Sequence, residues 1–117
     1  MRMNSKKLSF PWGTEDLFVL NTPVTVKFLY VKKGEAPSLQ YHHHREEFWR
    51  VVSGNPELTI GAEKAVAHPG EEFNIPKETQ HRISATTDDV VVLEISTGEF
   101  DEADIIRLED KYGRITS

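Results

Sequence analysis

The stretch from Gly34 to Gly54, GEAPSLQYHHHREEFWRVVSG, constrains the fold more than any other part of this chain. It carries three consecutive histidines and two adjacent glutamates just ahead of a short apolar run. Side chains at positions i and i+2 of a strand lie on the same face, so Gln40 and His42 are expected to point the same way. After a short turn, Glu47 can return on the adjacent strand to meet them. Nitrogen and oxygen donors that converge in this way favour a divalent first-row metal ion.

The remainder of the chain alternates between short β segments and turns. The clearest segment is Val24–Val31, in which Val24, Val26, Phe28 and Tyr30 share one face. The run Val90–Ser96 is almost continuously apolar, which is typical of a strand buried inside a barrel or sandwich. About nine such segments, with turn signals every eight to twelve residues, predict an all-β sandwich or barrel. The other expected strands are 57–60, 65–68, 73–75 and 81–85.

Length and composition narrow the class of protein. A chain of 117 residues suits a single domain. Its net charge of −5 argues against nucleic acid as a partner, and no apolar run approaches the ~18 residues of a membrane span. The absence of cysteine excludes disulfides and thiolate metal sites. The N-terminus has no hydrophobic signal-peptide core, so we expect a cytoplasmic enzyme or binding protein.

The two ends of the chain differ in character from the middle. Residues 1–9 are interpreted as an N-terminal leader, followed by a single domain over 10–117. The segment Phe10–Gly13 is expected to form a turn whose Trp12 acts as an aromatic plug at one end of the core. Residues 100–104 resemble an acidic helix start, and 105–108 suit a helical turn or a last strand. The sequence therefore predicts a short helical or irregular C-terminal tail.

A second stretch, GEEFNIPKETQH, runs from Gly70 to His81. Together the two stretches resemble the motifs of the cupin superfamily, in which His-x-His and a Glu are followed by one further His. The resemblance implies a jelly-roll barrel. It also implies a metal held by Gln40, His42, Glu47 and His81, with Gln40 in place of the usual first histidine. Zinc is our first choice of metal, with manganese, cobalt, nickel or iron as alternatives.

A narrower resemblance covers residues 11–114. The segment SLQYHHHREEFWRVVSG is similar to the signature of type II phosphomannose isomerases, and 11–13, 75–76, 81–82, 96–99 and 110–114 also match that family in order. The sequence departs from it at Phe48 (usually His), Glu78 (usually Gly) and Ala85 (usually Asn). By strand alternation, Phe48 should point away from the metal. The resemblance implies interconversion of mannose 6-phosphate and fructose 6-phosphate, through an enediol whose oxyanion the metal stabilises.

The resemblance also suggests residues for the reaction. His44, which has the same inward parity as His42, is our first candidate for the acid/base, with Lys27 and Glu94 as rivals and Glu47 as a further alternative. His44 is also an alternative to Gln40 as a metal ligand, whereas His43 has outward parity. The cations expected to bind the substrate phosphate are Arg45, Arg107 and Arg114, because guanidinium groups offer bidentate contacts. Arg107 and Arg114 are equally suited to structural ion pairs with the acidic tail.

Two other functions remain open at this point. One is a sugar-phosphate-binding cupin without turnover, which the departures at Phe48 and Glu78 favour. The other is a metal-dependent cupin oxygenase, although an amide ligand at Gln40 argues against this function. The expected partners are a small sugar phosphate and a second copy of the chain. A small jelly roll leaves sheet edges to cover, so we expect a two-fold homodimer in which the 1–9 leader crosses between chains.

Overall fold

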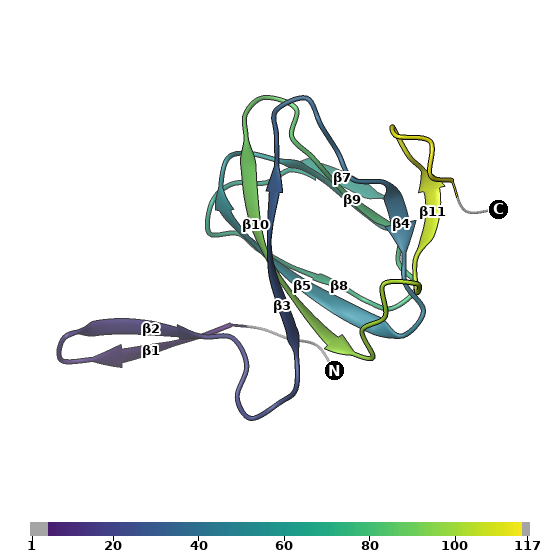
Figure 1. Cartoon of the computed structure of the whole chain (residues 1–117). Helices are drawn as coiled ribbons and strands as arrows, with labels where there is room; N and C mark the ends of the chain where they lie inside the picture. Colours follow the sequence, from purple (N-terminus) through teal and green to yellow (C-terminus); the bar gives the residue numbers. More distant parts are fainter. Residues whose placement is uncertain (1–4, 116–117) are drawn as a thin grey trace.

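The computed structural model describes residues 5–115, and within this range it consists of strands and turns with no helix (Figure 1). The sequence-based prediction of an all-β fold is therefore confirmed. None of the described segments is a helix long and apolar enough to cross a membrane. The eleven strands are β1 (Lys6–Phe10), β2 (Gly13–Leu17), β3 (Thr25–Val31), β4 (Leu39–Tyr41), β5 (Arg45–Ser53), β6 (Glu57–Ile60), β7 (Glu63–Val66), β8 (Glu72–Ile75), β9 (His81–Ser84), β10 (Val90–Gly98) and β11 (Ile106–Glu109).

Nine of these strands form two antiparallel sheets that face each other. One sheet has the order β3-β10-β5-β8, and the other has the order β11-β4-β9-β6-β7. Figure 1 shows the two sheets enclosing a barrel, with β3 at the edge of one sheet and β11 at the edge of the other. Strands β1 and β2 form a separate hairpin. This arrangement is the jelly-roll architecture expected from the sequence.

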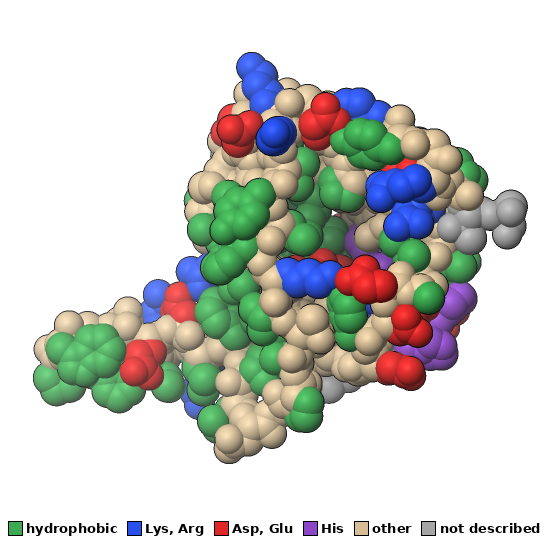
Figure 2. Space-filling model, in the orientation of Figure 1, with side chains coloured by type: hydrophobic (Ala, Val, Ile, Leu, Met, Phe, Trp, Pro, Cys, Tyr) green, Lys and Arg blue, Asp and Glu red, His purple; other side chains and the backbone are tan. Residues whose placement is uncertain are grey.

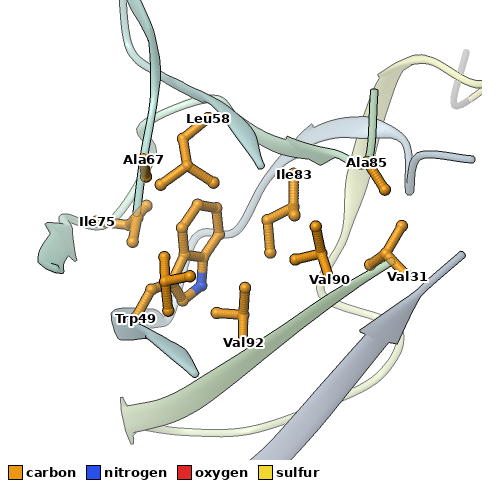
Figure 3. Packing of buried hydrophobic residues seen from close by; sticks show 10 residues of the cluster. Val31, Trp49, Leu58, Ala67, Ile75, Ile83, Ala85, Val90 and Val92 are labelled. Carbon is orange, nitrogen blue, oxygen red and sulfur yellow. The ribbon is translucent and has the colours of Figure 1, made fainter. Parts of the chain in front are cut away.

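The core lies between the two sheets and is built by strand alternation. Trp49, which is 1% exposed, packs at its centre against valines of β10 and against Leu58 and Ile83 of the opposite sheet (Figure 3). The turn after β5 needs glycine at position 54. Gly54 has φ +79°, and a Cβ atom there would lie 2.2 Å from the carbonyl oxygen of Asp89. The backbones of these two turns therefore approach so closely that only glycine fits at position 54.

The outer face of the β3-β10-β5-β8 sheet carries a second, smaller cluster. Phe48 and Ile95 are buried there beneath Phe18, Val19 and Val24. Phe48 therefore points away from the barrel interior, as alternation along β5 predicts. Its substitution for the histidine of the related motif leaves the inner face of β5 unchanged.

Of the two alternatives for residues 105–108, the last strand is confirmed, whereas the helical or irregular tail is wrong. Residues 106–109 form strand β11, which pairs with β4, so the tail is neither helical nor wholly irregular. A strand forms here because β4 presents a free edge of the sheet, and pairing satisfies the backbone groups of both segments. The preceding residues Asp101–Asp104 form a turn that places β11 on that edge.

The N-terminal expectations also change. Residues 1–4 lie outside the described range, but Lys6–Phe10 already belongs to a hairpin with Gly13–Leu17, so a boundary after residue 9 would cut through it. The prediction that Trp12 plugs the core is wrong, because its side chain is 70% exposed and stacks on Phe10 at the hairpin tip. The two-residue loop places both aromatic side chains at the end furthest from the core.

Glu78 adopts the left-handed conformation, with φ +61°, at the position where the related motif has glycine. This conformation costs an L-residue about 1–2 kcal/mol. Replacement by glycine removes that cost, but part of the gain is offset because glycine makes the unfolded chain more flexible. We expect Glu78→Gly to stabilise the protein by about 0.5–1 kcal/mol and to raise the melting temperature by roughly 2–5 °C in calorimetry. Asn21 (φ 53°) is the matched control, because asparagine tolerates this conformation. An equal rise for Asn21→Gly would contradict the strain at Glu78.

Candidate metal centre

Three buried side chains meet inside the barrel. His42 follows β4, His81 begins β9 and Glu47 lies on β5 of the facing sheet. The Nε2 atoms of His42 and His81 each lie 3.4 Å from a different carboxylate oxygen of Glu47. All three ligand atoms lie within 4.8 Å of one another. Atoms bound to one ion at about 2.1 Å in tetrahedral geometry are separated by about 3.4 Å, so the spacing suits a single metal ion.

Backbone carbonyls orient both histidine rings. The Nδ1–H of His42 donates to the carbonyl oxygen of Asp104 at 2.7 Å, and that of His81 donates to the carbonyl of Thr79 at 2.9 Å. In both rings the lone pair is therefore on Nε2, which faces the cluster. The Nε2 atom of His81 is buried and has no hydrogen-bond partner within the described residues. A metal ion would supply the missing partner, and carbonyl acceptors on the far nitrogen are typical of metal-binding histidines.

Burial sets the charge state of the cluster. It lowers the pKa of His42 to about 4 and also lowers the pKa of His81. Both rings are therefore neutral at pH 7, and protons do not compete with a metal for their lone pairs. Burial also raises the pKa of Glu47. A divalent cation would oppose that increase by favouring the carboxylate form.

A second carboxylate, Glu94, lies beside Glu47. It is 7% exposed and stands opposite Trp49 and Lys27 on neighbouring strands, on the inner face of β10. Burial first, and the charge of Glu47 next, raise the pKa of Glu94 to about 7. The indole Nε1–H of Trp49 donates to Glu47 at 3.2 Å and fixes its carboxylate. The site thus holds one carboxylate among the histidines and a second one beside it.

Arg45 and Phe100 close the cluster on one side. The guanidinium of Arg45, 7% exposed, donates to His42 Nε2 at 3.2 Å and lies 3.4 Å from Glu47. It also lies 4.2 Å from the centre of the Phe100 ring, whose other cationic neighbour is Lys27 at 4.3 Å. Arg45 balances the buried negative charge. Because it uses the His42 lone pair, it must turn away for an ion to bind there.

Gly98 makes this packing possible. It stands opposite Arg45 in the β10–β5 ladder, and a Cβ atom at Gly98 would lie 2.5 Å from the carbonyl oxygen of His44. With φ +99°, the position favours glycine on conformational grounds as well. The end of β10 therefore lies directly against the first residues of β5, and the segment that carries Phe100 follows immediately.

The structure places the other two residues considered as ligands differently. Gln40 is half-buried, pairs with His81 in the β4–β9 ladder and lines the same small cavity as His81, Trp49 and Glu94. Its Oε1 accepts a hydrogen bond from Ser38 at 2.7 Å. His44, predicted to point inward, is exposed, and its backbone N–H donates to Asp104. Period-two alternation fails here because residues 43–44 form a bend between strands. His43 is exposed, as expected.

The predicted catalytic and phosphate-binding cations lie at different depths. Lys27 is partly exposed and pairs with Glu102 at 3.4 Å, beside the cluster. Arg107 stands opposite Gln40 in the β11–β4 ladder, so its side chain leaves the same face of the sheet. Arg114 is exposed, forms an ion pair with Asp110 and lines an outer pocket of about 440 Å³ with Tyr30 and Tyr112.

Two features of the site were not predicted from the sequence. Glu47 meets the histidines from the facing sheet, not from the adjacent strand as expected, because β5 pairs with β8 and β10. The groups that orient and cover His42 come from the segment 100–104, roughly sixty residues further along the chain. Its acidic composition was visible, but no local spacing links it to the histidines. Figure 2 shows the resulting hollow between the sheets, with a histidine at its floor.

Comparison with known proteins shows which family the chain belongs to. The family model "Mannose-6-phosphate isomerase C-terminal" matches residues 2–110. The chain is 38% identical over 111 residues to xanthan biosynthesis protein XanB of Xanthomonas campestris, covering 93% of this chain and 24% of that protein. It is 36% identical over 107 residues to mannose-1-phosphate guanylyltransferase ManC of Salmonella typhimurium, covering 90% and 22%. The chain thus spans about a quarter of the length of the curated relatives it matches.

Solved structures support the same fold. The capsular polysaccharide assembling protein CapF of Staphylococcus aureus superimposes with a TM-score of 0.67 at 19% identity, covering 91% of this chain and 34% of CapF. A cupin protein of Bacteroides fragilis superimposes with a TM-score of 0.60 at 24% identity, covering 71% and 75%. The chain therefore shares the fold of that cupin protein, and it belongs to the mannose-6-phosphate isomerase C-terminal family.

Proposed function

We propose that this cupin domain is a metal-dependent isomerase that interconverts mannose 6-phosphate and fructose 6-phosphate. The observation that carries the proposal is the buried trio His42, Glu47 and His81, with both Nε2 lone pairs turned inward and a second carboxylate beside it. An aldose–ketose isomerase needs these two elements, an electrophile for the carbonyl oxygen and a base for the adjacent carbon. Membership of the family supports the same activity.

His42, Glu47 and His81 would hold the ion, and Gln40 would complete the set from the neighbouring position on β4. A divalent ion bound there supplies a Lewis acid for the carbonyl and enediolate oxygens of the open-chain sugar. A neutral amide donates less charge than imidazole, so Gln40 would leave the ion more electrophilic. Zinc is our first choice, because three or four nitrogen and oxygen ligands in a small buried cluster suit its coordination.

Glu94 is the base that we propose for the proton transfer. As a carboxylate it takes the proton from C2 of mannose 6-phosphate, which leaves the enediolate. It then returns that proton to C1 while the proton of the 2-hydroxyl passes to O1, which gives fructose 6-phosphate and restores the carboxylate. Glu94 lines the same cavity as Gln40 and His81 and lies deep in the barrel. Lys27 is the rival, but its ammonium is paired with Glu102, whereas the exposed side chain of His44 lies outside the cavity.

Arg107 is the phosphate-binding residue that we favour. Its position opposite Gln40 in the β11–β4 ladder puts it on the same face of the sheet as this proposed ligand. Arg45 lies against the buried carboxylate of Glu47, and the guanidinium of Arg114 forms two hydrogen bonds with Asp110 beside the outer pocket. We therefore assign Arg45 to the charge balance of the site, and Arg114 to the outer pocket.

One observation favours a second candidate, a sugar-phosphate-binding domain without turnover. Arg45 donates to His42 Nε2, the atom that the metal requires. If the guanidinium keeps that position in solution, the cluster is an internal ion pair and the barrel binds ligand without chemistry. The two functions differ in whether an added divalent metal ion gives the protein isomerase activity.

The test is an isomerase assay of the metal-free protein after addition of zinc, manganese, cobalt, nickel or iron. We expect fructose 6-phosphate to form from mannose 6-phosphate with at least one of these ions. Arg107→Ala should raise KM about ten- to a hundred-fold, because it removes a charge-assisted hydrogen bond worth roughly 1.5–3 kcal/mol. Arg114→Ala is the control and should change KM by less than three-fold.

Calorimetry with fructose 6-phosphate separates the two candidates. Binding of the sugar phosphate without turnover under every metal would favour the binding domain. Neither binding nor turnover would rule out both sugar-phosphate functions, and a cupin oxygenase would then be the next activity to assay.

A further inference from the structure

The hairpin β1–β2 projects from the barrel as an N-terminal arm (Lys6–Leu17) (Figure 1). The described chain measures 53 × 33 × 22 Å, and its radius of gyration is 14.8 Å, against about 13.4 Å for a compact domain of this length. The two strands pair only with each other among residues 5–115. A two-stranded hairpin is marginally stable by itself in water, so the arm is expected to pack against something.

The tip of the arm is apolar. Phe10 and Trp12 stack there with ring centres 5.3 Å apart, and they are 41% and 70% exposed. Hydrophobic side chains are also visible on the face of the arm that Figure 2 presents. Two stacked aromatic rings at the end of a projecting hairpin are typical of a contact surface, because aromatic side chains are enriched at the centre of interfaces.

A matching surface lies on the outer face of β3. Val26, Phe28 and Tyr30 are 56%, 54% and 74% exposed, and they lie side by side because they alternate with inward-facing residues. Their partners in register on β10 include Leu93 opposite Phe28 and Val91 opposite Tyr30. We call this surface the β3 strip.

The base of the arm already covers the neighbouring part of that face. Phe18, Val19 and Val24, which link the arm to β3, pack on Phe48 and Ile95. Asp16 pairs with Arg50 at 2.7 Å, and Ser5 donates to Glu72 at 2.6 Å. The base is thus fixed on β5 and β8 while the tip extends away from its own barrel. One continuous apolar face is covered near β5 and exposed along β3.

We infer that this chain forms a two-fold dimer in which the arm of each protomer packs its Phe10–Trp12 tip on the β3 strip of the other. An exchange of this kind is self-complementary, since each copy offers one arm and one strip. It covers both exposed apolar surfaces in one contact. It also gives the isolated hairpin a second layer to pack against.

The area available suits a stable dimer. Each aromatic side chain buries about 150–250 Å² when fully covered. Phe10, Trp12, Phe28 and Tyr30, together with the exposed Leu20 and Val26, therefore provide on the order of the 800 Å² a side that stable interfaces use. The arm also keeps β3, an edge strand, from pairing with other molecules.

Sedimentation equilibrium of the whole chain tests the inference. The wild type should be a dimer at micromolar concentration. Trp12→Ser and Tyr30→Ser should each raise the dimer dissociation constant about thirty-fold or more, the effect of removing a central interface residue. Val66→Ser is the control, because Val66 is an apolar residue on β7 that is 56% exposed and lies outside both surfaces, and it should leave the constant unchanged. Thermal unfolding of each variant checks that the barrel still folds.

Cross-linking identifies which surfaces meet. The chain has no cysteine, so single-cysteine variants react only at the chosen position. Mixing Thr14→Cys with Lys32→Cys, two exposed positions beside the tip and the β3 strip, should give a cross-linked heterodimer with a short bis-maleimide, whereas Thr14→Cys with Val66→Cys should give none. A wild type that sediments as a monomer, or a dimer whose constant neither variant changes, would overturn the inference. Neither result depends on the proposed isomerase activity.

Discussion

Replacing His81 by alanine should remove the metal ion from this protein. The His81 ring presents a neutral, buried Nε2 toward Glu47, and no other side chain in the trio can replace it. We expect the wild type to bind about one ion per chain, and the variant to retain almost none when measured by elemental analysis after dialysis. Isomerase activity should fall below detection, because the polarised carbonyl oxygen loses its partner.

A second readout is independent of activity. Zinc at a hundred times its dissociation constant stabilises a protein by about 2.7 kcal/mol, which corresponds to roughly 10 °C in melting temperature for a domain of this size. The wild type should show this shift and His81→Ala should not. His43→Ala is the matched control, because His43 is an exposed histidine next to His42, and it should keep both metal and shift. A His81→Ala protein that still holds one ion per chain would rule out the site.

Replacing Glu94 by glutamine should lower kcat about a hundred- to ten-thousand-fold, the usual contribution of a positioned base. Glutamine keeps the shape of the buried side chain but cannot accept the C2 proton. Metal content should be unchanged, because Glu94 lies outside the trio of His42, Glu47 and His81. The measurement is steady-state kinetics with mannose 6-phosphate, together with metal analysis of the same preparation.

The comparison variants for Glu94 are Lys27→Met and His44→Ala. The Lys27 ammonium is paired with Glu102 at the protein surface, and the side chain of His44 is exposed. Each should lower kcat by less than ten-fold. If Lys27→Met instead loses more activity than Glu94→Gln, the ammonium is the acid/base and the assignment of Glu94 is wrong. If the Glu94→Gln variant also loses its metal, the Glu94 side chain helps to hold the ion.

The sequence by itself determined the all-β class and most strand positions. Alternation is a local property, so Val24–Val31 and Val90–Ser96 could be predicted from side-chain period alone. The same rule predicted that Phe48 lies on the outer face, where it packs with Ile95. Spacing and resemblance together predicted that His42, Glu47 and His81 converge, and they lie within 4.8 Å of one another.

Local alternation could not predict geometry where strands end. His44 follows His42 by two residues, but the bend at 43–44 turns its side chain outward. Glu47 comes from the facing sheet, because the pairing of β5 depends on β8 and β10, which lie far along the chain. The tail formed β11 because β4 offered an unpaired edge, although its acidic start resembled a helix.

The tertiary structure alone decided what surrounds the site and what lies exposed. Asp104 orients His42, and Phe100 packs on Arg45, through contacts between residues more than fifty positions apart that no local spacing records. The Trp12 side chain is large and aromatic, which favours burial, but the hairpin carries it away from the core. Residue type and period determine which face of a strand is apolar. Which element covers that face depends on the long-range packing of the sheets.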